Sequence, residues 1–231
     1  MKIAIYSLTR DRLWSTMPCF TSLREKAGEP FFHVVVDNGS ADGTLDWLLN
    51  EFKPDRTIKL AENAGISRAS NLALEEIFRA VPDVDTIIKA DNDCMVVSED
   101  ILTHLIKVSE ELMRPFASLW VLSPSVSGIN RQPKRNRKFW TPSYEVGETG
   151  IVGGLFHVVP AYIYRRYRYP ENLPLARGQD DHFCQTVKDF GARIGYIENL
   201  HVEHHLTTDG QCGKDRPYFE RKWAEEKTVI A

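Results

Sequence analysis

Residues 86–97 read Thr-Ile-Ile-Lys-Ala-Asp-Asn-Asp-Cys-Met-Val-Val. The apolar run over 86–89 predicts a short buried strand, and Asp91-Asn92-Asp93 follows where that strand ends. Two carboxylates separated by one residue project to the same side of an extended backbone, and they repel each other unless a cation offsets their charge. Mg2+ and Mn2+ are suitable cations, since such ions bind one or two carboxylates together with substrate phosphates. By itself the triplet is more typical of a solvated turn, but the apolar residues on both sides of it favour a cation-binding site.

The segments before and after this stretch alternate between β-rich runs and helical patterns. Strands are expected at 2–8, 31–36, 56–60 and 86–89, and helices at 13–27, 44–52, 67–79 and 101–113. Alternation with short connections predicts right-handed crossovers and an α/β fold, in which helices flank a mostly parallel sheet.

The second half of the chain is less regular. Strands are expected at 119–123, 149–159 and 194–197, a helix at 183–190, a basic loop at 131–138, and a charged tail with a short helix near 218–227. Because no repeat or low-complexity linker divides the chain, we expect a single domain.

The overall composition excludes several classes of protein. The 231 residues carry a formal net charge of -3, which argues against a dedicated nucleic-acid binder. The four cysteines are scattered without CxxC spacing, which predicts reduced thiols. The apolar run at the N-terminus is too short for a signal peptide, and no run approaches the roughly 18 apolar residues of a membrane-spanning helix. These features predict a cytoplasmic protein.

Polar side chains follow three of the expected strands at the edge where the strands end. They are Thr9 and Arg10 after the first, Asp37 after the second, and 91–93 after the fourth. Ligands of open parallel sheets bind outside the carboxyl ends of the strands, so these groups would form one pocket. Asp37 suits a hydrogen bond from a nucleobase or ribose, although Asp-Asn-Gly-Ser by itself more often forms a turn.

Another group of candidates lies at the start of the helix expected at 67–79. Asn63, Gly65 and Arg68 suit a pyrophosphate, since helix N-termini and arginine side chains both bind phosphate oxygens. A cap, with Gly65 easing the turn, explains Asn63 equally well.

Six segments, taken in order, resemble the GT-A glycosyltransferases, and in particular the family 2-like inverting enzymes. The segments are Val34-Val-Val-Asp37-Asn-Gly-Ser40-Ala-Asp42-Gly-Thr44, Asn63-Ala-Gly65 through Asn71, Asp91-Asn-Asp93, Gly153-Gly154, Gly178-Gln-Asp180-Asp181-His-Phe183-Cys184, and Gly191-Ala-Arg-Ile-Gly195-Tyr with His204-His205. The resemblance runs from residue 2 to about residue 206. It implies one GT-A domain, with a Rossmann-like nucleotide-sugar-binding half over about 1–97, an acceptor and catalytic half over about 98–206, and a tail over 207–231.

The resemblance implies donor and metal ligands. Asp93 would ligate the Mn2+ or Mg2+ that bridges the diphosphate, and His204 would complete the metal site, with His205 as the alternative. A UDP-sugar is the favoured donor. The residues implied to bind the donor are Thr9, Arg10, Asp37, Asn63, Arg68, Asp91, Asn92, Gly153 and Gly154.

Asp180 stands where this family places its catalytic carboxylate, with Asp181 beside it. The family more often has Glu-Asp here, and Gln179 departs from that pattern, so both aspartates remain candidates. Acidic residues at the start of a helix also favour the helix dipole, which explains the pair without catalysis. One carboxylate acting as general base, opposite the leaving group, gives direct displacement with inversion. The expected activity is transfer of a hexosyl or pentosyl group to an acceptor hydroxyl.

Two basic stretches carry neighbouring aromatic residues, at 131–140 and 165–169. Such charge runs are usually solvated loops. The functional alternative for the first stretch is a mobile loop that closes on the diphosphate or on an anionic acceptor. Together the two stretches suggest an acidic acceptor, such as a phosphorylated glycan or a nucleic acid.

Two other functions fit part of the pattern. A nucleotidyltransferase resembling the sugar-nucleotide pyrophosphorylases would carry a glycine-rich loop after the first strand, and residues 7–12 contain no glycine. A catalytically inactive nucleotide-sugar-binding domain would be expected to lack Asp93 or the Asp180-Asp181 pair, and both are present.

Overall fold

The computed structural model describes residues 1–116, 119–128, 133–174 and 178–205, with the side chains of 113–116 left aside. One ten-stranded sheet runs through this part of the chain, in the order β3-β2-β1-β4-β9-β6-β10-β8-β7, and β5 also pairs with β10. The strands are β1 (Ile3–Thr9), β2 (Phe32–Asp37), β3 (Arg56–Lys59), β4 (Thr86–Ala90), β5 (Cys94–Val96), β6 (Trp120–Ser127), β7 (Arg137–Trp140), β8 (Glu145–Glu148), β9 (Phe156–Pro160) and β10 (Arg193–His204).

Most strands of this sheet point in one direction. β1, β2, β3 and β4 are mutually parallel, and β6, β7 and β10 run the same way. β5, β8 and β9 run against them, and β9 lies between β4 and β6. The prediction of an α/β fold with a mostly parallel sheet is therefore confirmed.

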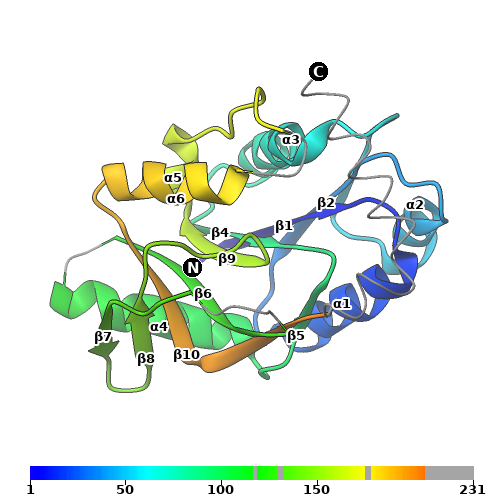
Figure 1. Ribbon diagram of the computed structural model, residues 1–231. Coiled ribbons are helices and arrows are strands. Elements are labelled where there is room, and N and C mark those ends of the chain that lie inside the picture. Colours follow the sequence, from blue (N-terminus) through cyan, green and yellow to red (C-terminus); the bar gives the residue numbers. More distant parts are fainter. Residues whose placement is uncertain (117–118, 129–132, 175–177, 206–231) are drawn as a thin grey trace.

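Helices cover both faces of the sheet. Figure 1 shows α3, α5 and α6 on one side and α1 and α4 on the other. The helices are α1 (Leu13–Glu25), α2 (Thr44–Trp47), which continues as a π-helical turn (Leu48–Phe52), α3 (Gly65–Ala80), α4 (Ile101–Phe116), α5 (Ala161–Arg166) and α6 (Gln179–Asp189).

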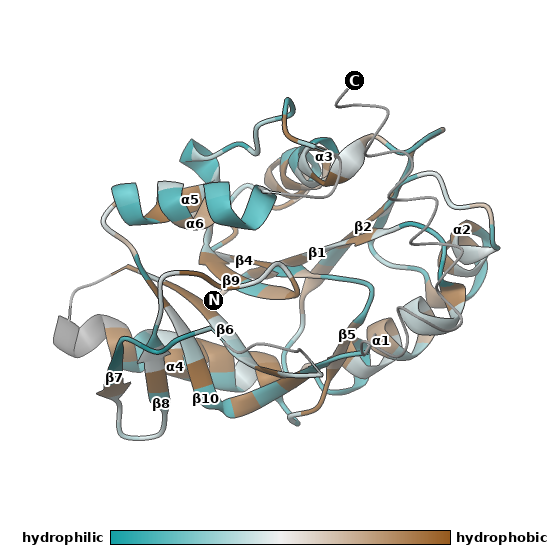
Figure 2. Ribbon diagram, in the orientation of Figure 1, coloured by the Kyte–Doolittle hydropathy of each residue, from teal (hydrophilic) through white to brown (hydrophobic). Residues whose placement is uncertain are grey.

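The core lies where the central strands meet these helices. Val34, Ile5 and Ile87 on neighbouring strands and Leu74 and Ile77 on α3 have no exposed surface. Figure 2 shows the central strands as largely hydrophobic, whereas α6 is mostly hydrophilic on its outer side. Within the described residues, no helix combines the length and apolar character needed to cross a bilayer.

Three cysteines, Cys19, Cys94 and Cys184, are buried free thiols, as the sequence predicts. Burial raises the pKa of Cys19 to about 12, and Asp93 adds to this effect, so the thiol stays protonated. Cys212 and the short helix expected near 218–227 lie outside the described residues.

The structure corrects the prediction of one strand over 149–159. Only Phe156–Pro160 (β9) joins the sheet, and the residues before it form a loop. The physical reason lies at Gly154: its N–H donates to Asp180 Oδ2 and its carbonyl accepts from Lys89 Nζ. Backbone groups that a strand would use for pairing are therefore bonded to side chains.

The basic segment at 131–138 is only partly a loop. β7 begins at Arg137 and pairs with β8 as an antiparallel hairpin at the end of the sheet. The helix expected at 183–190 begins at Gln179, directly after Gly178, whose φ of 81° provides the turn into it. Three short elements that the sequence analysis did not predict, β5, β8 and α5, hold six residues or fewer each.

Candidate functional site

The register of the first strands brings the predicted polar residues to one edge of the sheet. Thr9 pairs with Asp37 across β1 and β2, and Tyr6 pairs with Lys89 across β1 and β4. Asp91, two residues past Lys89, therefore lies near the level of Thr9. Thr9 Oγ1 donates to Asp37 Oδ1 at 3.4 Å, and both residues are buried.

A buried lysine joins Asp91 to the loop before β9. Lys89 Nζ lies 2.5 Å from Asp91 Oδ1 and 2.5 Å from the carbonyl oxygen of Gly154. The N–H of Gly154 in turn donates to Asp180 Oδ2 at 2.8 Å. Because Gly154 bonds Lys89 with one backbone group and Asp180 with the other, it links the Asp180 carboxylate to the cation that Asp91 bonds.

The electrostatics of this group follow from burial and from these charges. Burial alone would lower the pKa of Lys89, but Asp91, Asp180 and Tyr6 outweigh it and raise that pKa above its ordinary range. Burial raises the pKa of Asp91 to about 6; Lys89 opposes the shift, and Asp93 and Asp180 reinforce it. Lys89 therefore stays charged and offsets neighbouring carboxylates that would otherwise repel each other.

The two candidate catalytic aspartates differ in their surroundings. Both lie in the first turn of α6. Asp180 is half-buried and bonded to Gly154, whereas Asp181 is exposed. Gln179, which departs from the family pattern, is buried and donates to the carbonyl of Pro174. The geometry therefore favours Asp180 over Asp181 for a role inside the site.

Asp93 is paired with an arginine that follows β1. Arg12 Nη1 donates to Asp93 Oδ2 at 3.1 Å, and Nη2 donates to Asn92 Oδ1 at 2.9 Å. Burial works to raise the pKa of Asp93, but the charges of Arg12, His204 and Lys89 outweigh it and hold that pKa below its ordinary value. Asn92 also donates to Thr16 Oγ1 on α1, so its side chain is held from two directions.

The backbone at Asp11 and Arg12 is strained. Their φ angles of 54° and 62° lie in the left-handed region, which costs about 1–3 kcal/mol for a residue other than glycine. Hydrogen bonds to the loop after β2 hold this conformation. Asp11 N donates to Ser40 Oγ at 2.8 Å, and Asp11 Oδ1 accepts from Ala41 N at 2.8 Å. These bonds join the turns that follow β1 and β2.

His204 reaches Asp93 because β10 pairs with β5. In this antiparallel pair His204 lies opposite Cys94, and the N–H of His205 donates to the carbonyl of Asp93. His204 Nε2 lies 3.6 Å from Asp93 Oδ2. The His205 ring instead packs on Trp14, with centroids 5.6 Å apart. Of the two histidines, His204 is therefore the one whose ring nitrogen faces the Asp93 carboxylate.

This arrangement fits a divalent ion that takes further ligands from a substrate. An oxygen and an imidazole nitrogen 3.6 Å apart can share an ion, because bonds to divalent metals are roughly 2.0–2.3 Å long. No group of three or more His, Cys, Asp or Glu side chains in the described residues could enclose an ion on its own. Ligands from outside these side chains, such as water or phosphate oxygens, would therefore complete the coordination.

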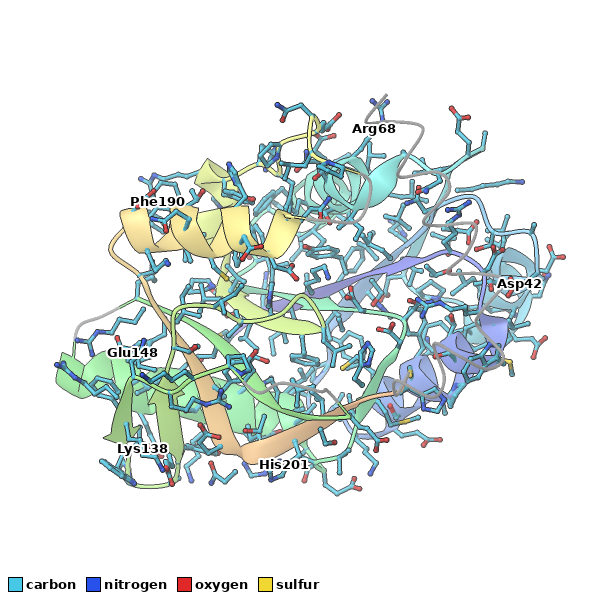
Figure 3. All side chains as sticks on the ribbon, in the orientation of Figure 1. Asp42, Arg68, Lys138, Glu148, Phe190 and His201 are labelled. Atoms are coloured by element: carbon cyan, nitrogen blue, oxygen red, sulfur yellow. The ribbon has the colours of Figure 1, made fainter. Side chains whose placement is uncertain are left out.

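Some predicted donor residues have other contacts. Arg68 is exposed and pairs with Glu171 at 3.7 Å, and Figure 3 shows it at the outer end of α3. Asn63 accepts from Asn38 Nδ2 and from Gly65 N, so it stabilises the turn before α3. The N-cap of α3 is Ala64, which has no side-chain cap hydrogen bond, so the expectation that Asn63 is the cap is wrong. Arg10 is half-buried directly after β1, and Gly153 donates to the hydroxyl of Tyr196.

The basic-aromatic stretches lie on separate elements, and several of their charges are paired. Arg135 bonds Glu198 and lies over the Tyr196 ring at 4.2 Å. Lys138 pairs with Glu145 on the β7–β8 hairpin, which Figure 3 shows at the far end of the sheet from Asp42. In the second stretch, Tyr167 and Tyr169 are buried against Phe183.

Sequence reasoning missed Lys89 and Arg12. A lysine inside an otherwise apolar strand run was a usable signal, since a buried lysine needs a partner. Arg12 gave no signal beyond its place three residues after β1.

No protein-family model matches the chain, and no curated protein sequence does either. Solved structures do. Staphylococcus aureus TarS is 16% identical with a TM-score of 0.65, over 95% of this chain and 38% of that one. GalNAc-T7, solved with UDP, GalNAc and Mn2+, is 12% identical with a TM-score of 0.67, over 91% of this chain and 45% of that one.

The mannosyltransferase PcManGT from Pyrobaculum calidifontis, solved with GDP-Man and Mn2+, is 13% identical with a TM-score of 0.65, over 100% of this chain and 64% of that one. This chain therefore spans less than two thirds of the length of each of these structures. These similarities show that the chain has the GT-A fold, as its sequence motifs predict.

Proposed function

We propose that this GT-A chain is a glycosyltransferase, which moves a sugar from a nucleotide diphosphate donor to an acceptor hydroxyl. One observation carries the proposal: at the edge where the parallel strands end, Asp93 lies beside His204, and Asp180 is linked to Asp91 through Gly154 and Lys89. Two structures of the same fold were solved with a nucleotide or nucleotide sugar and Mn2+, which supports a donor of this class and Mn2+ or Mg2+ as the ion. A UDP-sugar is the favoured donor.

On the donor side, Asp37 would accept hydrogen bonds from the base or ribose, with Thr9 orienting its carboxylate. Asp93 and His204 would hold the divalent ion together with the diphosphate oxygens. The ion, when bound, supplies positive charge that stabilises the diphosphate leaving group. Asp91, held by Lys89, would lie toward the ribose.

On the acceptor side, Asp180 would accept the proton of the attacking hydroxyl as general base. Its bond from the Gly154 N–H holds the carboxylate in place. A single base on the face opposite the leaving group gives displacement with inversion. Asp181, which is exposed, would contribute to the start of α6 rather than to the reaction.

The acceptor we propose is a glycan hydroxyl. The pairing of Arg135 with Glu198 and of Lys138 with Glu145 leaves less positive charge for an anionic acceptor than the sequence suggests. An anionic acceptor, such as nucleic acid, would instead bind with strong dependence on salt.

The test is thermal stabilisation of the full chain by UDP, GDP and CDP, each with and without Mn2+. The proposal predicts a shift in Tm for one diphosphate that is larger with Mn2+, followed by release of that diphosphate from one matching sugar donor. No shift with any nucleotide contradicts the proposal. Binding without diphosphate release across a donor and acceptor panel would instead identify an inactive nucleotide-sugar-binding domain.

A further inference from the structure

We infer that Arg12 is a donor-binding residue that competes with the divalent ion for Asp93. In the ligand-free protein its guanidinium bonds the carboxylate that the ion needs, and on loading it transfers from Asp93 to the diphosphate. The diphosphate part of this inference rests on the proposed function.

The contacts of Arg12 place a cation on the candidate metal ligand. Its two terminal nitrogens bond Asp93 Oδ2 and Asn92 Oδ1, and 9% of its side chain is exposed. His204 Nε2 faces the same oxygen, Asp93 Oδ2, at 3.6 Å. An ion shared by Asp93 and His204 would therefore bind the oxygen that Arg12 now bonds, and two cations on one carboxylate oxygen repel each other.

The diphosphate offers Arg12 a replacement partner. A guanidinium displaced from Asp93 would stay buried, and a buried charge requires new hydrogen-bond acceptors. Phosphate oxygens match the planar fork of arginine. The neighbouring cation, Lys89, cannot take this role, because 4% of its side chain is exposed and Asp91 and Gly154 hold its ammonium group.

The backbone around Arg12 allows this transfer without refolding. The left-handed conformation at Asp11 and Arg12 is held by bonds to Ser40 and Ala41, and Leu13 N donates to Asp42 Oδ2 at 2.8 Å. These bonds join backbone N–H groups to the side chains of Ser40, Asp42 and Asp11, and the guanidinium takes no part in them. The side chain can therefore change partners while its anchor stays fixed.

The experiment compares Mn2+ binding and nucleotide binding in Arg12→Gln. The first readout is Mn2+ alone, by electron paramagnetic resonance of the free ion; the second is the nucleoside diphosphate that stabilises the wild type, titrated at saturating Mn2+. We expect Mn2+ to bind about tenfold more tightly in Arg12→Gln, because Arg12 no longer competes with it for Asp93. We expect the diphosphate to bind about tenfold more weakly, because it loses a charge-assisted bond from Arg12.

Three further variants control this comparison. Arg79→Gln makes the same charge change at an exposed position on α3, with 68% of its side chain exposed, and should alter neither affinity. Asp93→Asn combined with Arg12→Gln should abolish the gain in Mn2+ affinity. Arg12→Lys keeps the charge without the fork, so its Mn2+ affinity should stay near the wild-type value, and it serves if Arg12→Gln fails to fold.

The opposite changes in Mn2+ affinity and diphosphate affinity distinguish this role of Arg12 from a structural one. If Arg12 only supports the fold, both affinities fall in Arg12→Gln, and the inference is overturned. Tighter Mn2+ binding with unchanged diphosphate affinity overturns the transfer to the diphosphate. If the wild type binds no nucleoside diphosphate, the proposed function fails, and the Mn2+ readout still decides whether Arg12 and the ion compete for Asp93.

Discussion

Substitution of Gly154 by alanine should disable the site by moving Asp180. A Cβ at Gly154 would lie 2.7 and 2.9 Å from the two carboxylate oxygens of Asp180 and 2.9 Å from Lys89 Nζ. Ordinary contacts begin at 3.4 Å, so the carboxylate must retreat by the difference between 3.4 and 2.7 Å, about 0.7 Å. Its bond from the Gly154 N–H, a charge-assisted bond of about 1.5–3 kcal/mol, is then lost or distorted.

Misplacement of a reacting group by about 1 Å costs roughly a hundredfold in rate, so we expect release of nucleoside diphosphate to slow about 100-fold in Gly154→Ala. The free energy of unfolding, measured by urea denaturation, should fall by about 1–3 kcal/mol. Gly150→Ala is the matched control, because a Cβ there meets nothing within 4 Å. Wild-type turnover in Gly154→Ala, or an equal loss in Gly150→Ala, would refute the reasoning.

Asp93→Asn should abolish the effect of Mn2+ on nucleotide binding while the circular dichroism spectrum stays native, because the amide is a poor metal ligand; a retained Mn2+ effect would contradict the metal site. Asp180→Asn should bind the donor but lose about 100-fold or more in turnover, whereas Asp181→Asn should retain activity; the reverse result would assign the base to Asp181. Burial lowers the pKa of His33 from 6.5 to about 3, so below pH 6.5 the unfolded chain binds a proton that the folded chain does not. As the pH is lowered from 6.5 to about 3, this residue should therefore reduce the free energy of unfolding by about 1.4 kcal/mol per pH unit. In urea titrations over this pH range, the free energy of unfolding of His33→Gln should depend less steeply on pH.

The parts of the fold that the sequence predicts are those encoded locally. Asp37 and Asp91 end apolar runs, and the ends of parallel strands meet at one edge, so their proximity follows from the pattern alone. The helix over 44–52 was located correctly, although its second half is a π-helical turn. The sequence does not distinguish an α-helical from a π-helical turn, because the two have similar apolar periodicities.

The parts that it did not predict depend on contacts between distant segments. An apolar run such as β9 does not encode the direction of its strand. The sequence therefore could not predict that β9 lies antiparallel between β4 and β6. The role of Lys89 depends on Gly154, which lies 65 residues later in the chain. Arg12 becomes informative only once Asp93 is beside it, because a lone arginine after a strand is ordinary.

The irregularity in β10 has a consequence for how this protein tolerates changes in length. Ile197 pairs with Pro124 and His201 pairs with Ser125, so residues 198–200 form an excursion between two paired stretches. Loss or gain of a residue at Asn199, which is exposed, can be absorbed there without shifting the partners on either side. A deletion between 201 and 204 would turn the imidazole of His204 to the opposite face of the sheet. Changes in length should therefore be tolerated at Asn199 and not in residues 201–204. Substitutions at Glu198, which bonds Arg135, and at Leu200, which is buried, should be tolerated less well.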